Sequence, residues 1–141
     1  MPDLGDYPFH VMEKLRYADT DRQGHVNNGV YAVLFEAGRV HLFRQPNREI
    51  MPEGREYVLA RIVIDFRREL FWPGDVTVGT GLTRLGNSSF TLKQAVFRGV
   101  EMVAEGESVL VLTDKATRRS TPIPQATRAA LAIYAMPGAE M

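Results

Sequence analysis

The chain has 141 residues, of which 45% are hydrophobic, and its 17 basic and 17 acidic residues give a formal net charge of zero. This length and composition predict one domain over residues 1–141 that closes a single core. The balanced charge excludes bulk electrostatic binding of nucleic acid, which needs a basic excess or stripe, and the lack of cysteine excludes disulfides and thiolate chemistry.

The sequence carries neither of two common signals for leaving the cytoplasm. The first ten residues lack a basic stretch followed by an apolar one, so we expect no signal peptide. No apolar run approaches the roughly 20 residues that cross a bilayer. We therefore expect a cytoplasmic protein without membrane insertion, and a net charge near zero is compatible with self-association.

The first part of the chain predicts one strand and one long helix. Residues 9–17 alternate between apolar and polar side chains, which indicates a strand. Residues 28–43 carry apolar side chains at helical spacing around much of the circumference, which predicts a helix buried on several sides. Residues 44–57 contain two prolines, a glycine and several charges, and we expect a loop or lid there.

The rest of the chain predicts four strands and a short helix. Four segments are rich in Val, Leu, Thr and Phe, and turn-like sequences separate them, so we expect an antiparallel meander. From about Pro124 a short C-terminal helix is expected. A helix that is apolar almost all round is best buried by a sheet that curls around it, which predicts an α+β fold. The four strand segments are residues 57–70, 75–86, 88–99 and 101–114.

The segment D-T-D-R-Q-G-H-V-N-N-G-V-Y, residues 19–31, holds more polar groups than a turn needs. Asp19 is expected to bond backbone amides within the loop. Gly24 offers a backbone position for a positive φ or for close approach of a ligand. Asn27 and Asn28 are both good N-caps for the helix that follows, and capping explains one of them.

A carboxylate just upstream of a helix N-terminus can be catalytic. The first turn of a helix exposes unpaired N–H groups and the positive end of the helix dipole. An acid in front of it therefore faces a ready oxyanion hole, which suits hydrolysis of an ester, amide or thioester. His25 is either a hydrogen-bonded loop residue or a base.

Other chemistries find little support in the sequence. It has no G-x-S-x-G elbow, no phosphate-binding glycine loop after a strand and no H-E-x-x-H helix. Asp19, Asp21 and His25 could contribute to a metal site, but no second cluster lies at ligand spacing. We therefore expect no metal and no cofactor.

Y-A-D-T-D-R-Q-G-H-V-N-N-G-V-Y followed by F-E-A-G-R resembles the signature of hotdog-fold acyl thioesterases, the 4-hydroxybenzoyl-CoA thioesterase-like group. It is most similar to the G-H-V-N-N branch, which includes many acyl-CoA thioesterases and the plant acyl-carrier-protein thioesterases. F-W-P-G-D, G-N-S-S-F and I-P-Q-A-T-R-A-A-L extend the likeness over nearly the whole chain. The resemblance implies a five-stranded antiparallel sheet around one long central helix, in homodimers or homotetramers with active sites between subunits.

The same resemblance implies the roles of individual residues. It assigns the action on the thioester to the second acid of D-x-D, Asp21, as general base or nucleophile. The N–H of Asn28 would bind the thioester oxygen, while His25 and Asn27 either position water or hold the loop. Arg84 and Arg118, with two other basic residues, are placed to meet the phosphates of coenzyme A, although a solvated charged rim explains them equally well. The expected substrate-binding residues are Gly24, Tyr31, Ser88, Ser89, Arg84 and Arg118.

These features predict an acyl-CoA thioesterase that releases the free acid and the thiol. An acyl-carrier-protein thioesterase is the alternative within the same reaction, and carrier protein would then be a partner. A hotdog dehydratase, with His25 as its catalytic residue, or a non-catalytic acyl-binding protein is the alternative of a different class.

Overall fold

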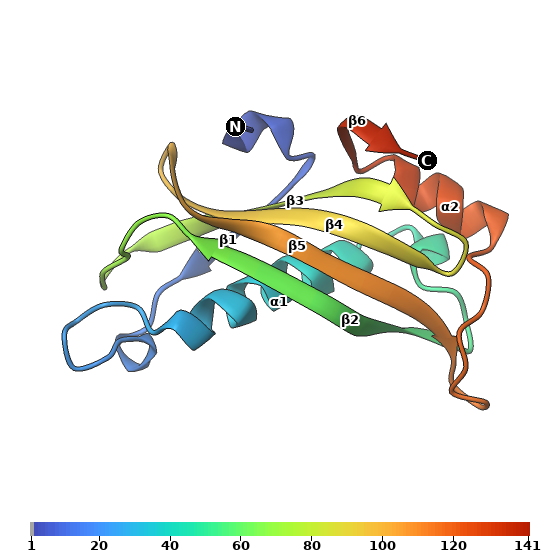
Figure 1. Cartoon of the computed structure of the whole chain (residues 1–141), viewed down its shortest axis with the longest axis horizontal. Coiled ribbons are helices and arrows are strands. Elements are labelled where there is room, and N and C mark those ends of the chain that lie inside the picture. Colours follow the sequence, from blue (N-terminus) through green and yellow to red (C-terminus); the bar gives the residue numbers. More distant parts are fainter. Residues whose placement is uncertain (1) are drawn as a thin grey trace.

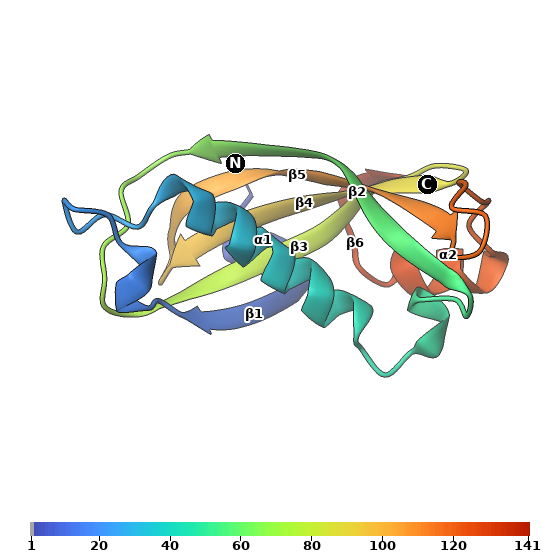
Figure 2. The same cartoon turned by 90° about the horizontal axis from the view of Figure 1, so that it is seen from below.

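The computed structural model describes residues 2–141, with the Arg48 side chain outside that description. A curled sheet wraps around α1, which crosses its concave face (Figures 1 and 2). The order in the sheet is β1-β3-β4-β5-β2 with every neighbouring pair antiparallel, and β6 pairs parallel with β3. The helices are α1 (Asn28–Phe43) and α2 (Gln125–Ala132), and the strands are β1 (Phe9–Lys14), β2 (Arg55–Phe66), β3 (Asp75–Leu85), β4 (Ser89–Arg98), β5 (Glu101–Asp114) and β6 (Ala135–Glu140).

The predicted α+β hotdog architecture, five antiparallel strands around a long central helix, is confirmed. α1 covers the residues expected of it, and α2 starts one residue after Pro124. The six-residue β6 was not expected, and it contains Pro137 and Gly138, which weaken any strand pattern. No helix in the described chain is long and apolar enough to cross a membrane.

The predicted four-strand meander is wrong at β2. β3, β4 and β5 do follow one another, but β2 pairs with β5 at the far edge, and β1 lies beside β3 instead. The sheet encloses α1 only if the strand before the helix and the strand after it lie on opposite flanks. Residues 67–74 carry the chain across the end of the sheet from β2 to β3 (Figure 2).

α1 meets the sheet most closely at Gly38. A Cβ there would lie 2.7 Å from Thr80 Oγ1 and 2.8 Å from Gln94 Nε2, which is closer than real contacts allow. Gln94 Nε2 donates to the Phe35 carbonyl at 2.8 Å and to Thr80 Oγ1 at 3.0 Å. The absence of a side chain at Gly38 thus lets the helix backbone bond directly to the sheet.

A buried polar row crosses three strands at this point. Ser108 Oγ donates to Gln94 Oε1 at 2.7 Å, and Arg39 Nη1 donates to Ser108 Oγ at 3.0 Å and to Gln94 Oε1 at 3.3 Å. Burial lowers the pKa of Arg39, and the negative charge of Glu36 partly offsets this effect. The row separates two apolar clusters, one toward the start of α1 and one toward its end.

We expect Gly38→Ala to lower the free energy of unfolding by about 1–3 kcal/mol, because the added methyl group overpacks the contact with Thr80 and Gln94. Urea unfolding followed by circular dichroism measures the change. Gly29→Ala is the matched control on the same helix, because its nearest neighbour would be 3.6 Å away. Alanine there should be neutral or stabilise by up to about 1 kcal/mol. Equal stability of the Gly38→Ala and native proteins would contradict this account of the contact.

Candidate active site

Asp21 opens a tight loop that leads into α1. One of its carboxylate oxygens, Oδ1, accepts hydrogen bonds from the backbone N–H of Gln23 at 2.9 Å and of His25 at 3.1 Å. The Asp21 N–H donates to the His25 carbonyl at 2.8 Å, and Gly24 closes the turn with φ +81°. The positive φ expected at Gly24 is therefore present, and the loop fixes the orientation of an exposed carboxylate.

Asp19 is buried and holds the start of the same loop. Its Oδ2 accepts from the backbone N–H of Arg16 at 2.8 Å, and its Oδ1 accepts from the Arg16 guanidinium at 2.9 and 3.1 Å. Its carbonyl accepts from the Asn27 N–H at 2.8 Å. The backbone-binding role expected of Asp19 is present, joined by an ion pair that the sequence did not indicate.

Asn27 and Asn28 occupy different positions at the N-terminus of α1. Asn27 is the N-cap, and its side-chain oxygen accepts from the Gly29 N–H at 3.0 Å. Asn28 is the first residue of the helix, so no helix carbonyl one turn earlier can accept a hydrogen bond from its N–H. The capping half of the sequence prediction thus falls on Asn27.

A cavity of about 300 Å³ lies between this loop and the end of β2. Asp21, His25, Asn28 and Tyr31 all line it, so the structure brings these four predicted residues together, whereas Gly24 and Asn27 lie outside the lining. Burial raises the pKa of Tyr31, whose ring lies edge-on to Phe66 at 5.1 Å. The lining residues are Asp21, His25, Val26, Asn28, Tyr31, Phe66, Arg67, Arg68, Glu69 and Leu70.

Glu69 is one of the lining residues that the sequence did not indicate, and it lies beside His25. Its Oε1 lies 3.6 Å from His25 Nδ1, and the His25 ring lies edge-on to Phe71 with 4.8 Å between centroids. The segment around Glu69 has the pattern of the end of a strand, and this pattern does not predict a contact with the loop that contains His25. The signal that could have found it is a single acid between two arginines and three large apolar residues.

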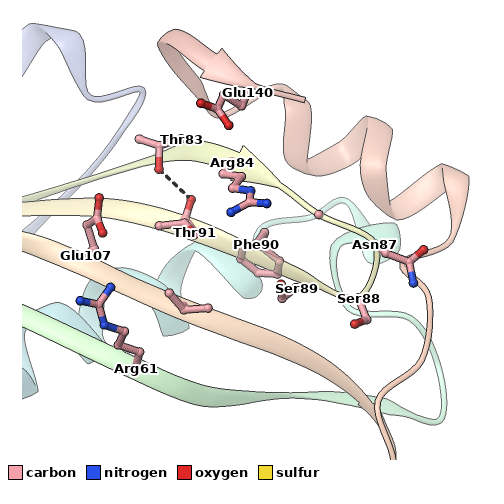
Figure 3. Close-up of a pocket in the computed structure, with 12 residues that line it drawn as sticks. Arg61, Thr83, Arg84, Asn87, Ser88, Ser89, Phe90, Thr91, Glu107 and Glu140 are labelled. Carbon is pink, nitrogen blue, oxygen red and sulfur yellow. Dashed lines mark hydrogen bonds between the residues drawn. The ribbon is translucent and has the colours of Figure 1, made fainter.

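Arg84, Ser88 and Ser89 lie at the other end of the sheet, around the turn between β3 and β4 (Figure 3). They line a second cavity of about 690 Å³, together with Arg61 and Glu107. Arg118 lies in the turn after β5 and borders neither of these two cavities. Within one chain, the structure therefore does not bring these four predicted residues to Asp21.

Residues 2–141 contain no group of three or more His, Asp or Glu side chains arranged to hold a metal ion. Each charged group of the smaller cavity has a partner: loop amides for Asp21, Glu69 for His25, and Glu105 and Glu101, which lie outside the lining, for Arg67 and Arg68. The cavity therefore presents acids, an imidazole, two arginines and a helix N-terminus.

Comparison with known proteins places the chain in a family. Residues 15–131 match the model of the thioesterase-like superfamily. A Pseudomonas aeruginosa protein of known structure is 26% identical, covers 96% of this chain and 97% of its own, and superposes with a TM-score of 0.86. A Bacillus stearothermophilus structure, named as a predicted thioesterase, is 32% identical with a TM-score of 0.82, covering 90% of this chain and 96% of its own.

A third structure is that of a thioesterase from Thermus thermophilus complexed with coenzyme A and Zn. It is 31% identical, with a TM-score of 0.80, and the match covers 92% of this chain and 96% of that one. The hotdog-fold thioesterase family expected from the sequence is thereby confirmed. The chain belongs to the thioesterase-like superfamily, and thioester hydrolysis is the activity that this membership supports.

Proposed function

We propose that the protein hydrolyses an acyl-CoA thioester to the free acid and coenzyme A in the cavity between residues 19–28 and the end of β2. The observation that carries this proposal is that the Asp21 carboxylate and the first residue of α1 line the same cavity. The coenzyme A complex of the Thermus thermophilus relative supports the choice of thiol.

Asp21 is suited to act on the thioester carbonyl. Two loop amides hold Oδ1, which leaves Oδ2 to take a proton from water as the water oxygen attacks the carbonyl carbon. Alternatively, Oδ2 attacks the carbon itself, the coenzyme A thiolate leaves, and water hydrolyses the resulting anhydride. Both routes use the same fixed carboxylate and end in a free acid and a protonated thiol.

The N-terminus of α1 stabilises the oxyanion in either route. Negative charge develops on the carbonyl oxygen. The Asn28 N–H can donate a hydrogen bond to this oxygen, and the positive end of the helix dipole attracts its charge. Asn27 keeps the first turn in place by capping Gly29, so its role is positional.

His25 and Glu69 form the second polar pair of the cavity. The Glu69 carboxylate faces Nδ1 and Phe71 lies against the ring, so the other ring nitrogen, Nε2, is the one available to bind water or the thioester sulfur. We assign Glu69 as the residue that positions His25.

A homodimer completes the proposed site. β2 is the last strand of the sheet, it is 12 residues long, and its exposed apolar residues include Val58, Leu59 and Phe66. Such an edge pairs readily with another strand. In an antiparallel β2–β2 pair, the Phe66 end lies beside the Arg55 end of a second copy. That end of the second copy carries the larger cavity, which would bring Ser88, Ser89 and Arg84 toward the reaction.

We expect Asp21→Asn to lower kcat by about 100-fold or more, because it removes the charge while the amide oxygen still accepts the loop hydrogen bonds. A thiol-trapping dye measures turnover of acetyl-, hexanoyl-, dodecanoyl- and benzoyl-CoA. Asp3→Asn is the control, since Asp3 is exposed at the other end of the sheet's first strand. Near-native turnover by Asp21→Asn would overturn the assignment, and hydration of crotonyl-CoA without hydrolysis would favour a dehydratase.

We expect Glu69→Gln to lower kcat by about tenfold with a smaller effect on KM, because the His25 ring loses its charged partner. If Glu69 acts through His25, the double variant with His25→Ala should be no slower than His25→Ala alone. Glu53→Gln, an exposed acid in the segment before β2, is the control. Additive losses in the double variant would show that Glu69 acts independently.

We expect Leu59→Lys to shift the protein from dimer to monomer, because like charges would face each other near the middle of paired β2 edges. Light scattering behind size-exclusion chromatography measures the mass. Val100→Lys is the control, since Val100 is 95% exposed in the turn between β4 and β5. An unchanged dimer mass for Leu59→Lys would place the interface elsewhere.

A further inference from the structure

An exposed aromatic patch adjoins the smaller cavity. It consists of Tyr17, Phe71 and Trp72, which are 75%, 45% and 44% exposed. The Phe71 ring lies edge-on to His25 in the cavity wall, and the Trp72 ring lies edge-on to Tyr17 with 5.3 Å between centroids. Two loops far apart in sequence thus present exposed aromatic rings next to His25, a residue of the smaller cavity.

Large apolar groups that remain exposed together commonly mark a binding site. Tyr17 and Trp72 follow β1 and precede β3, strands that pair with each other at the flank of the sheet opposite to β2. Pairing through the β2 edge would therefore leave the two rings uncovered.

The Arg98 guanidinium lies beside the backbone that follows Trp72. Arg98 Nη2 is 3.4 Å from the carbonyl oxygen of Pro73, the residue after Trp72, and lies against the backbone of Gly74. In the described part of the chain, Arg98 has no carboxylate within 4.0 Å, whereas the nearby Arg68 has Glu101 at 3.5 Å. The Arg98 charge also partly offsets the rise that burial causes in the pKa of Tyr31. Among the described residues, a positive charge without a carboxylate partner thus lies beside the two residues that follow Trp72.

We propose that Trp72, supported by Tyr17, stacks against the adenine ring of coenzyme A and that Arg98 binds a phosphate of the same nucleotide. This proposal rests on the proposed function. A cavity of about 300 Å³ is at the lower limit for small-molecule sites, so the nucleotide end of the substrate lies outside it. An aromatic face and a guanidinium are the groups that bind a base and a phosphate.

The same surface distinguishes two thioester carriers. Coenzyme A ends in an adenine nucleotide, whereas an acyl carrier protein presents the pantetheine arm without one. Stacking on Trp72 therefore favours coenzyme A over the carrier protein, and pantetheine alone lacks the group that Trp72 binds. The nearby exposed acids, Asp75 and Glu101, oppose phosphate binding, so the contact depends on Arg98.

Fluorescence tests the stacking directly, because Trp72 is the only tryptophan of the sequence. Coenzyme A and adenosine 3′,5′-bisphosphate should quench the emission, and pantetheine should not. Asp21→Asn should show the same quenching, since binding needs no hydrolysis. If neither nucleotide quenches the emission, the proposal is overturned. An emission shift that depends on protein concentration and not on nucleotide would also overturn it, because it would show that a second copy covers the patch.

Kinetics test whether the contact serves the substrate. The quantity to measure is kcat/KM for the best acyl-CoA of the panel divided by kcat/KM for its acyl-pantetheine counterpart. Trp72→Ala should lower this ratio by about tenfold. Trp72→Phe should retain most of the ratio, and Arg98→Gln should lower it in a way that weakens at high salt. Ile133→Ala and Arg44→Gln, exposed residues at the other end of the molecule, are the matched controls.

The outcomes separate the two proposals. An unchanged ratio in Trp72→Ala, with turnover intact, would overturn the nucleotide contact and leave thioester hydrolysis standing. Quenching by coenzyme A together with full activity of Asp21→Asn would uphold the contact and overturn the catalytic assignment.

Discussion

The contact between α1 and the sheet at Gly38 is the constraint on which the rest of the structure depends. Only a residue without a side chain lets the helix come close enough for Gln94 to bond the Phe35 carbonyl. The polar row from Thr80 through Gln94 to Ser108 then fixes how far along the sheet the helix lies. Apolar packing alone allows sliding, whereas buried hydrogen bonds favour one register because leaving any of them unmade is costly.

This register decides where the N-terminus of α1 points. With its middle fixed on β3 and β4, the helix begins beside the end of β2, at the mouth of the smaller cavity. The loop before it is held separately, by the buried Asp19 and its ion pair with Arg16. Two independent anchors therefore place the Asp21 carboxylate in front of the helix dipole, and neither anchor uses the groups assigned to the reaction.

The proposed site binds the two ends of a long substrate on two different kinds of surface. As proposed above, the acyl thioester would meet the acid and the helix N-terminus, while the nucleotide would meet Trp72 and Arg98 outside the smaller cavity. Binding energy from the remote nucleotide can then be used to orient the reacting carbonyl. In the proposed homodimer, a second copy paired through β2 would supply the surroundings that one chain leaves open.

The sequence by itself determined the fold family and the bounds of α1, because helix periodicity and capping are local. It also indicated that Asp21, His25 and Asn28 lie close together, because they belong to one contiguous motif. It did not determine the place of β2, since strand patterns carry no information about which edge a strand takes. Nor did it reveal Glu69 near His25, the buried row around Arg39 or the patch formed by Tyr17 and Trp72. Only the tertiary structure decided these, because each joins segments whose proximity follows from the curl of the sheet around the helix.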